Sequence, residues 1–295
     1  MGSLDGKVAV VTGAGRGLGR AHALELARHG ARVVVNDIGA ALDGTDTGEQ
    51  PAQQVVDEIA AEGGEAAAHY GDVSVWDDAK ALLDFAVRRF GSLDVVVNNA
   101  GILRDRMIFN MAEEDWDAVM RVHLKGHFCM TRHATAYWRE QSKASGEPVY
   151  GRIINTSSEA FLFGSAGQPN YAAAKAGIVA LTLATAQSCW RYGITANAIC
   201  PRALTRMTES MGLDPQLFAP EHTAALVAFL ASPEAAKVSG QVFVVWGGTL
   251  RVMGSPPVDE EFLSEGAWSV EELEDRLVPL YDKREPVMDG FVVRP

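Results

Sequence analysis

The chain has 295 residues, of which 47% are hydrophobic and 22% are charged, a composition that predicts a soluble globular protein. Its formal net charge of -12 argues against non-specific nucleic-acid binding, although a local basic cluster can still bind an anionic ligand. No apolar run is long enough to cross a membrane, and no signal peptide precedes the first predicted strand. The cysteines, Cys129, Cys189 and Cys200, lack metal-type spacing and predict buried thiols. We therefore expect a cytoplasmic protein without a metal site.

Strand-like and helical runs alternate along the chain. The strand-like runs cover residues 8–12, 32–36, 66–70, 94–98, 152–156, 195–199 and 242–245. The helical runs cover residues 18–29, 51–62, 75–90, 113–141, 169–192 and 221–230. This order predicts a single α/β domain over residues 1–250, with a doubly wound, seven-stranded parallel sheet flanked by helices. Residues 251–295 are expected to form a C-terminal extension with one short helix.

A glycine-rich loop connects the first strand to the first helix. It reads GAGRGLG from Gly13 to Gly19, with the spacing Gly-x-x-x-Gly-x-Gly. Such a loop lets the backbone approach a pyrophosphate, and the helix N-terminus adds free N–H groups and a positive dipole end. The alternative is a tight turn without a ligand. We expect a dinucleotide to contact Gly13, Arg16, Gly17, Leu18 and Gly19.

Asp37 ends the second predicted strand, eighteen residues after Gly19. A carboxylate at this place can accept hydrogen bonds from the adenosine ribose and would repel a 2′-phosphate, which favours NAD. Arg16 in the glycine loop could instead favour a phosphate, and Asp37 could be an ordinary surface residue. We expect Asp37 to dominate and NAD to be the cofactor.

Three residues near the middle of the chain form a candidate catalytic set: Ser158, Tyr171 and Lys175. Tyr171 and Lys175 are four residues apart and share a face if the segment is helical. An ammonium beside a phenol lowers the pKa of the phenol, which predicts a general acid/base in Tyr171. The Ser158 hydroxyl can hold the substrate oxygen.

Together these motifs resemble the short-chain dehydrogenase/reductase family, whose members have a Rossmann fold. The resemblance spans roughly residues 5–250 and rests on Thr12 to Gly19, Asp72-Val73, Asn98-Asn99-Ala100-Gly101 and the Ser158, Tyr171 and Lys175 set. It implies that Asp72 and Val73 contact the adenine, while Asn99, Ala100 and Gly101 line the cofactor path. It also implies that Tyr171 and Lys175 contact the cofactor as well, with Lys175 holding the nicotinamide ribose, and that Thr205 lies by the carboxamide. Family members are commonly oligomers, so we expect a homodimer or tetramer.

His123 departs from the family pattern, which has a catalytic asparagine at this position in a Val-Asn-Leu context. A histidine can also hydrogen-bond a relay water, but it could equally be a buried residue without a catalytic role. The Val122-His123-Leu124 context resembles a narrower group. This group is the (3R)-hydroxyacyl-CoA dehydrogenase unit of peroxisomal multifunctional enzymes, together with its stand-alone bacterial relatives.

The substrate should be determined by apolar segments near the catalytic set. The family resemblance makes residues 203–220 a flexible lid, here with the apolar residues Met207, Met211, Leu213, Leu217 and Phe218. Residues 161–163 are expected to extend the same wall, although core packing is an equal alternative. Arg104 and Arg106 could meet a phosphate group or pair with Glu113, Glu114 or Asp115. Residues 39–50 are expected to form a mobile surface loop.

The tail contains a capping box, with Ser269 and Glu272 at the start of a predicted helix over residues 270–281. Its leucines, Leu273, Leu277 and Leu280, are expected to pack on this subunit or a neighbour. The sequence therefore predicts an NAD-dependent dehydrogenase acting on a secondary alcohol or ketone, with a 3-hydroxyacyl-CoA as the favoured substrate. Free hydroxysteroids are the alternative substrates. A non-catalytic NAD(H)-binding sensor or interaction protein is the alternative of another class.

Overall fold

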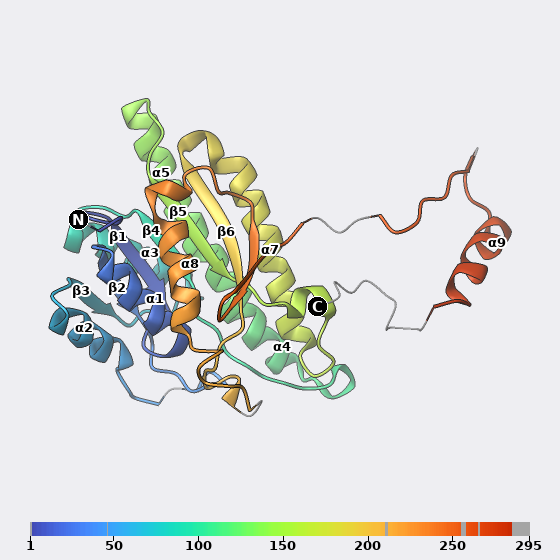
Figure 1. Cartoon of the computed structure of the whole chain (residues 1–295), viewed down its shortest axis with the longest axis horizontal. Coiled ribbons are helices and arrows are strands. Elements are labelled where there is room, and N and C mark those ends of the chain that lie inside the picture. Colours follow the sequence, from blue (N-terminus) through green and yellow to red (C-terminus); the bar gives the residue numbers. More distant parts are fainter. Residues whose placement is uncertain (1, 46, 210–211, 255–257, 265, 285–295) are drawn as a thin grey trace. The chain divides into compact units, whose positions relative to one another are not determined.

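The computed structural model describes residues 2–45, 47–209, 212–254, 258–264 and 266–284. The chain divides into two compact units, Met1–Met253 and Gly254–Pro295. The first unit carries the sheet and its covering helices (Figure 1). We propose that it is the catalytic domain and that the second unit is an extension.

The first unit is built on an eight-stranded sheet with the strand order β3-β2-β1-β4-β5-β6-β7-β8. The strands are β1 (Val8–Thr12), β2 (Arg32–Asn36), β3 (Ala66–His69), β4 (Val95–Asn98), β5 (Gly151–Thr156), β6 (Ile194–Pro201), β7 (Val242–Trp246) and β8 (Thr249–Val252). The pairings from β3 to β7 are all parallel, which confirms the predicted doubly wound fold. The eighth strand was not predicted. It pairs antiparallel with β7 across the two-residue Gly247-Gly248 turn, a hairpin signal present in the sequence.

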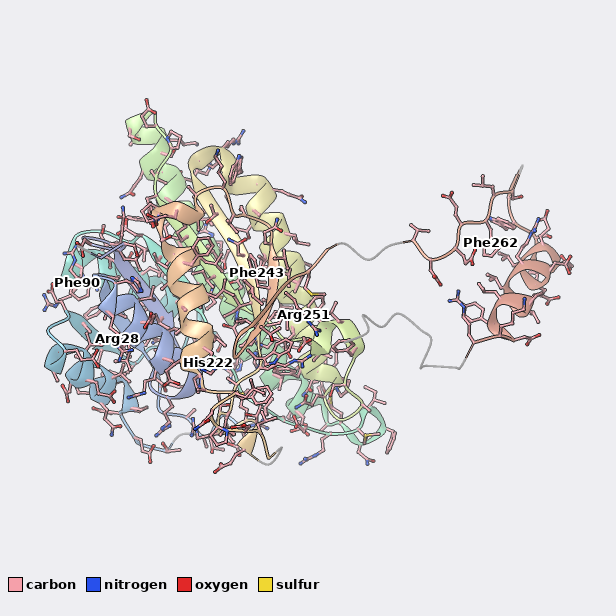
Figure 2. The ribbon with its side chains drawn as sticks, in the orientation of Figure 1. Arg28, Phe90, His222, Phe243, Arg251 and Phe262 are labelled. Carbon is pink, nitrogen blue, oxygen red and sulfur yellow. The ribbon has the colours of Figure 1, made fainter. Side chains whose placement is uncertain are left out.

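The core lies on both faces of the sheet because parallel strands in doubly wound folds are covered on both sides. Successive β1 residues point to opposite faces: Ala9 and Val11 pack in one cluster, and Val8 and Val10 pack in the other. Figure 2 labels Phe243 on β7, which packs in the same cluster as Ala9 and Val11. Each fully buried valine or leucine contributes about 1.5–3 kcal/mol relative to an exposed one.

The helices of the first unit cover the two faces of this sheet (Figure 1). They are α1 (Gly17–Arg28), α2 (Pro51–Ala61), α3 (Trp76–Phe90), α4 (Glu113–Met120), α5 (Gly126–Ser145), α6 (Ala160–Phe163), α7 (Pro169–Cys189) and α8 (Glu221–Ala231). The predicted helix over residues 113–141 is α4 and α5, joined by a π-helical turn over Arg121–Lys125. The π-helical turn changes the helical period over only five residues, so the apolar pattern of the sequence did not reveal it. No described helix is long and apolar enough to span a membrane.

Among the residues of the second unit that the structure describes there is one helix, α9 (Val270–Tyr281), with the predicted bounds. The predicted capping box is present: the Ser269 side chain accepts from the Glu272 N–H at 3.1 Å, and Glu272 accepts from the Ser269 N–H at 2.8 Å. No residue of α9 is buried within the described chain. The packing of its leucines therefore stays a prediction.

Candidate active site

The predicted site residues meet in one cavity of about 510 Å³ at the carboxyl ends of the central strands. Its lining includes Gly13, Arg16, Gly17, Leu18, Asp37, Asp72, Val73, Asn99, Ala100, Gly101, His123, Ser158, Tyr171, Lys175 and Thr205. Gly19 is the one predicted cofactor contact outside the lining. A Cβ there would lie 2.2 Å from the Gly13 carbonyl oxygen, so this glycine is needed for close packing within the loop.

The glycine loop is held against the segment after β4. Asn99 Nδ2 donates to the carbonyl oxygens of Thr12 and Gly13, both at 3.1 Å. A Cβ on Gly13, whose φ is +62°, would lie 2.8 Å from the Ala100 Cα. The loop therefore presents bare backbone to the cavity at the N-terminus of α1, which fits the pyrophosphate of a dinucleotide. Asn99 stabilises this loop through its side chain.

Asp37 is fixed at the rim of the cavity by two backbone donors. Its Oδ2 accepts from the Gly15 N–H at 2.9 Å, and its Oδ1 accepts from the Gly39 N–H at 2.8 Å. Arg16, the residue that could have favoured a phosphate, forms an ion pair with Glu49. The Asp37 carboxylate is thus anchored at the position where we expect the adenosine ribose. The Arg16 guanidinium, which could have favoured a 2′-phosphate, is paired with Glu49 instead.

Asp72 is anchored by three donors beside the cavity. Its Oδ1 accepts from the Ser74 N–H at 2.8 Å and the Ser74 hydroxyl at 2.6 Å. Its Oδ2 lies 3.1 Å from Arg121 Nη1. Burial raises the pKa of the Asp72 carboxyl, but these hydrogen bonds outweigh it and lower the pKa overall. The anchored carboxylate and Val73 form part of the wall at the predicted adenine end.

The catalytic set comes from two elements that meet at the cavity. Ser158 follows β5 directly, and Tyr171 and Lys175 lie one turn apart on α7. Lys175 Nζ donates to the Thr156 carbonyl oxygen at 2.6 Å and lies 5.3 Å from the centre of the Tyr171 ring. The end of β5 therefore fixes the lysine, and the helix period puts the tyrosine beside it.

Burial determines the charge of these groups. It raises the pKa of Tyr171 to about 12, with the Ser158 hydroxyl acting in the opposite direction. It lowers the pKa of Lys175 to about 7. The sequence-based expectation of a lowered tyrosine pKa is therefore wrong for this geometry, because burial of the phenol itself outweighs the opposing hydrogen bond with Ser158. The phenol is protonated at neutral pH, the form that donates a proton.

His123 lies in the π-helical turn and packs edge-on against Tyr171, with ring centres 5.3 Å apart. Its Nε2 is 3.1 Å from the Ile102 N–H nitrogen and 2.8 Å from the Ile102 carbonyl oxygen. Burial, followed by the nearby Lys175 charge, lowers the pKa of His123 well below its usual value. Its Nδ1 has no partner among the described residues. His123 is therefore a neutral ring in contact with both Ile102 and Tyr171, and its role in a proton relay stays a prediction.

The substrate side agrees only in part with the sequence-based expectations. Met207, Leu213 and Phe218 line the cavity as predicted, while Leu217 is 45% exposed outside the lining. Met211 lies outside the described residues. Residues 161–163 belong to α6 and do not line the cavity: Phe161 packs against the cluster of β6 and β7, Leu162 is buried, and Phe163 is exposed. This part of the prediction was wrong.

Several cavity residues were missed in the sequence. The most notable group is Ala40, Ala41, Leu42 and Gly44, since residues 39–50 were expected to be a surface loop. Ile102, Glu159, Arg202 and Arg206 also line the cavity. Most of these residues follow the carboxyl end of a strand, and that position is the signal that could have found them.

Arg104 and Arg106 both approach one carboxylate. Arg104 Nη1 lies 3.6 Å from Asp115 Oδ1, and Arg106 Nε lies 3.8 Å from Asp115 Oδ2. Of the carboxylates that the sequence offered as partners, the structure selects Asp115. Among the described residues, no group of three or more His, Cys, Asp or Glu side chains is arranged to hold a metal ion.

Comparison with known families identifies the chain. Residues 7–215 match the model of the short chain dehydrogenase family. The chain belongs to this family. It is therefore an oxidoreductase that uses a nicotinamide cofactor, which confirms the predicted family and enzyme class.

Its relatives are close. The chain is 52% identical to hydroxyacyl-CoA dehydrogenase ChsB1 of Mycobacterium tuberculosis, over 96% of this chain and 91% of that protein. It is 44% identical to peroxisomal multifunctional enzyme type 2 of Mus musculus, over 84% of this chain but 33% of that longer protein. A crystal structure of a short chain dehydrogenase from Mycobacterium avium matches with a TM-score of 0.86 and 53% identity, over 97% of this chain and 98% of that chain.

Proposed function

We propose that this protein is an NAD-dependent 3-hydroxyacyl-CoA dehydrogenase. The observation that carries the proposal is the 52% identity with a protein named hydroxyacyl-CoA dehydrogenase, over 96% of the chain, with Ser158, Tyr171 and Lys175 present in one cavity. When bound, the nicotinamide would accept or supply the hydride at C4, and the substrate carbon would be C3 of the acyl thioester.

The choice of NAD over NADP rests on Asp37. The carboxylate is held by the N–H groups of Gly15 and Gly39 at the cavity rim, and a 2′-phosphate beside it would bring like charges together. The pairing of Arg16 with Glu49 supports the same choice. The bare backbone of the glycine loop would hold the pyrophosphate, and Asp72 and Val73 would flank the adenine.

The catalytic roles follow from the protonation states. Tyr171, protonated at neutral pH, would donate its proton to a carbonyl oxygen held by the Ser158 hydroxyl. In the oxidative direction the substrate hydroxyl would give its proton to the deprotonated Tyr171 oxygen, and the protonated form of Lys175 favours that phenolate. Lys175 would also hold the nicotinamide ribose, and Thr205 would lie by the carboxamide. His123 would hold Tyr171 and Ile102 in place as a neutral ring.

The apolar residues Met207, Leu213 and Phe218 would cover the acyl chain. The family resemblance further supports a homodimer or tetramer, which analytical ultracentrifugation can test. The cytoplasmic location rests on the composition and the cysteines instead. The chain is also 40% identical, over 84% of its length, to a protein named 3-oxoacyl-[acyl-carrier-protein] reductase. This similarity supports testing the reduction of a 3-oxoacyl thioester as well as the oxidation.

The experiment is a substrate panel with NAD. It contains 3-hydroxyacyl-CoA esters of increasing chain length, one ester with a steroid-like acyl group, and free hydroxysteroids. We expect the CoA esters to give the highest kcat/KM. If free hydroxysteroids are oxidised far better than any CoA ester, the substrate assignment fails but the dehydrogenase stands. If no compound is oxidised and NAD still binds, the non-catalytic alternative gains support.

A further inference from the structure

The loop between β2 and α2 crosses the cofactor cavity. In the sheet, β1 lies between β2 and β4, so a loop that leaves β2 and reaches the segment after β4 must pass over the end of β1. The loop makes this crossing: the Leu103 N–H donates to the Leu42 carbonyl oxygen at 2.8 Å. Gly44, with φ at +90°, allows the close approach, because a Cβ there would lie 3.2 Å from the Ile102 side chain.

Arg104 strengthens this crossing. Its Nε donates to the Asp43 carbonyl oxygen at 3.0 Å, which ties the guanidinium to the loop. The same side chain lies 3.6 Å from Asp115 at the start of α4. Its side chain is only partly exposed, at 31%. Arg104 therefore joins the loop from β2 to the start of α4.

The backbone of Arg104 continues the connection to the catalytic tyrosine through Asn170. Asn170 Nδ2 donates to the Arg104 carbonyl oxygen at 3.0 Å and to the Asp115 carbonyl oxygen at 3.1 Å. Its Oδ1 accepts from the Tyr171 N–H at 2.8 Å. Asn170 is fully buried, so its amide has no water to replace a lost partner.

We propose that Arg104 and Asn170 are positioning residues that connect the loop over the cofactor to Tyr171. Arg104 retains the loop over the bound cofactor, and Asn170 holds the first turn of α7 so that the tyrosine hydroxyl faces the substrate oxygen with which it exchanges a proton. Gln168, whose Nε2 donates to Asp105 Oδ2 at 2.8 Å, adds a second tie between the same segments. The inference rests on the proposed function in two respects: the protein binds a nicotinamide cofactor, and Tyr171 exchanges the proton with the substrate.

Arg104 and Arg106 both approach Asp115, but their remaining hydrogen bonds go to different segments. Only Arg104 bonds to the loop over the cofactor, whereas Arg106 Nη1 donates to the neighbouring Asp105 carbonyl oxygen at 2.8 Å. Arg106 is also the more exposed, at 59% against 31%. The Arg106→Met variant is therefore a matched control for Arg104→Met, since both remove one cation and one approach to Asp115.

The first test measures NADH release by stopped-flow fluorescence, with no acyl-CoA present. Losing the charged hydrogen bond of Arg104 should speed release about tenfold in Arg104→Met, while Arg106→Met should stay within about twofold of wild type. Equal release from Arg104→Met and wild type, or equal acceleration in both variants, overturns the role of Arg104. If wild type binds no NADH, the proposed function itself fails instead.

The second test separates the two contacts of Asn170. Asn170→Ala removes both the bonds to the Arg104 segment and the acceptor for Tyr171, so kcat should fall about tenfold or more with little change in substrate KM. Asn170→Asp keeps an acceptor for the Tyr171 N–H and should recover much of kcat, while NADH release stays fast because the amide donors are gone. Melting temperatures identify variants that fail to fold.

A double variant decides whether the residues form one connection. If they do, Arg104→Met combined with Asn170→Ala should speed NADH release by clearly less than the product of the two single effects. The pH profile of kcat/KM should shift in Asn170→Ala and not in Arg106→Met, because only Asn170 touches the catalytic turn. Fully multiplicative effects together with an unchanged pH profile would contradict the proposal.

Discussion

The two ends of the cavity are built in different ways. At the cofactor end, the backbone of the glycine loop and fixed carboxylates form the walls, and Asp37 and Asp72 each accept at least two hydrogen bonds. At the substrate end, apolar side chains from the segment after β6 form much of the wall, among them Met207 and Phe218. A bonded backbone has one geometry, whereas an apolar wall can accept several ligand shapes.

The difference indicates where specificity resides. The cofactor end should tolerate few changes, because each hydrogen bond fixes a particular atom. The substrate end should tolerate changes of size at modest cost. The Ser158, Tyr171 and Lys175 set lies between these ends and serves both, so its variants should show the largest effects.

The largest effect is expected for Tyr171→Phe, which keeps the ring and removes the proton donor. The kcat should fall by roughly 10² to 10⁴, the usual loss for general acid/base catalysis. The dissociation constant for NAD should hardly change, because the variant keeps the ring and every other predicted cofactor contact. Steady-state rates and cofactor fluorescence titrations measure the two quantities. Wild-type turnover in this variant would remove Tyr171 from the chemistry.

The cofactor end was the more predictable part of the molecule. Its residues follow strands directly in the chain, so Gly13 and Asp37 could be placed from local sequence. Leu42 could not, because its position depends on a backbone contact with Leu103, sixty-one residues away. The pKa of Tyr171 also could not be predicted, since it depends on burial that only the folded chain creates.

Lys175 should make stability depend on pH. Its folded pKa, about 7, is below the usual 10.5, so above pH 7 the unfolded chain binds more protons than the folded chain. Stability contributed by this group should therefore rise with pH between 7 and 9, by up to about 1.4 kcal/mol per pH unit. Urea unfolding of wild type and Lys175→Met should show the rise in wild type alone. Parallel pH curves for the two proteins would mean that Lys175 keeps an ordinary pKa.

Asp37 tests the cofactor end. Asp37→Ser removes the carboxylate that repels a 2′-phosphate and keeps a small polar side chain. The ratio of kcat/KM for NAD over NADP should fall by roughly tenfold to a hundredfold, as expected for about 1.4 to 3 kcal/mol of removed repulsion. Arg16→Met serves as the comparison and should leave NAD preferred. An unchanged ratio in Asp37→Ser would assign the preference to another residue.

Phe218 tests the substrate end and should give the smallest effect. Phe218→Leu reduces the apolar wall without adding a polar atom. We expect KM to rise by a few-fold for long acyl chains and to change little for short ones, because about one methylene group of burial is worth about 0.8 kcal/mol. The cofactor preference should stay at its wild-type value. A shift in that preference would show that the two ends are not separate.

The most direct test of the proposed activity is oxidation of one 3-hydroxyacyl-CoA by the wild-type protein, followed as reduced cofactor with NAD and with NADP. We predict turnover with NAD and a kcat/KM at least about tenfold higher with NAD than with NADP, because of the Asp37 carboxylate. If neither cofactor supports turnover, or if NADP is preferred over NAD, the proposal is contradicted.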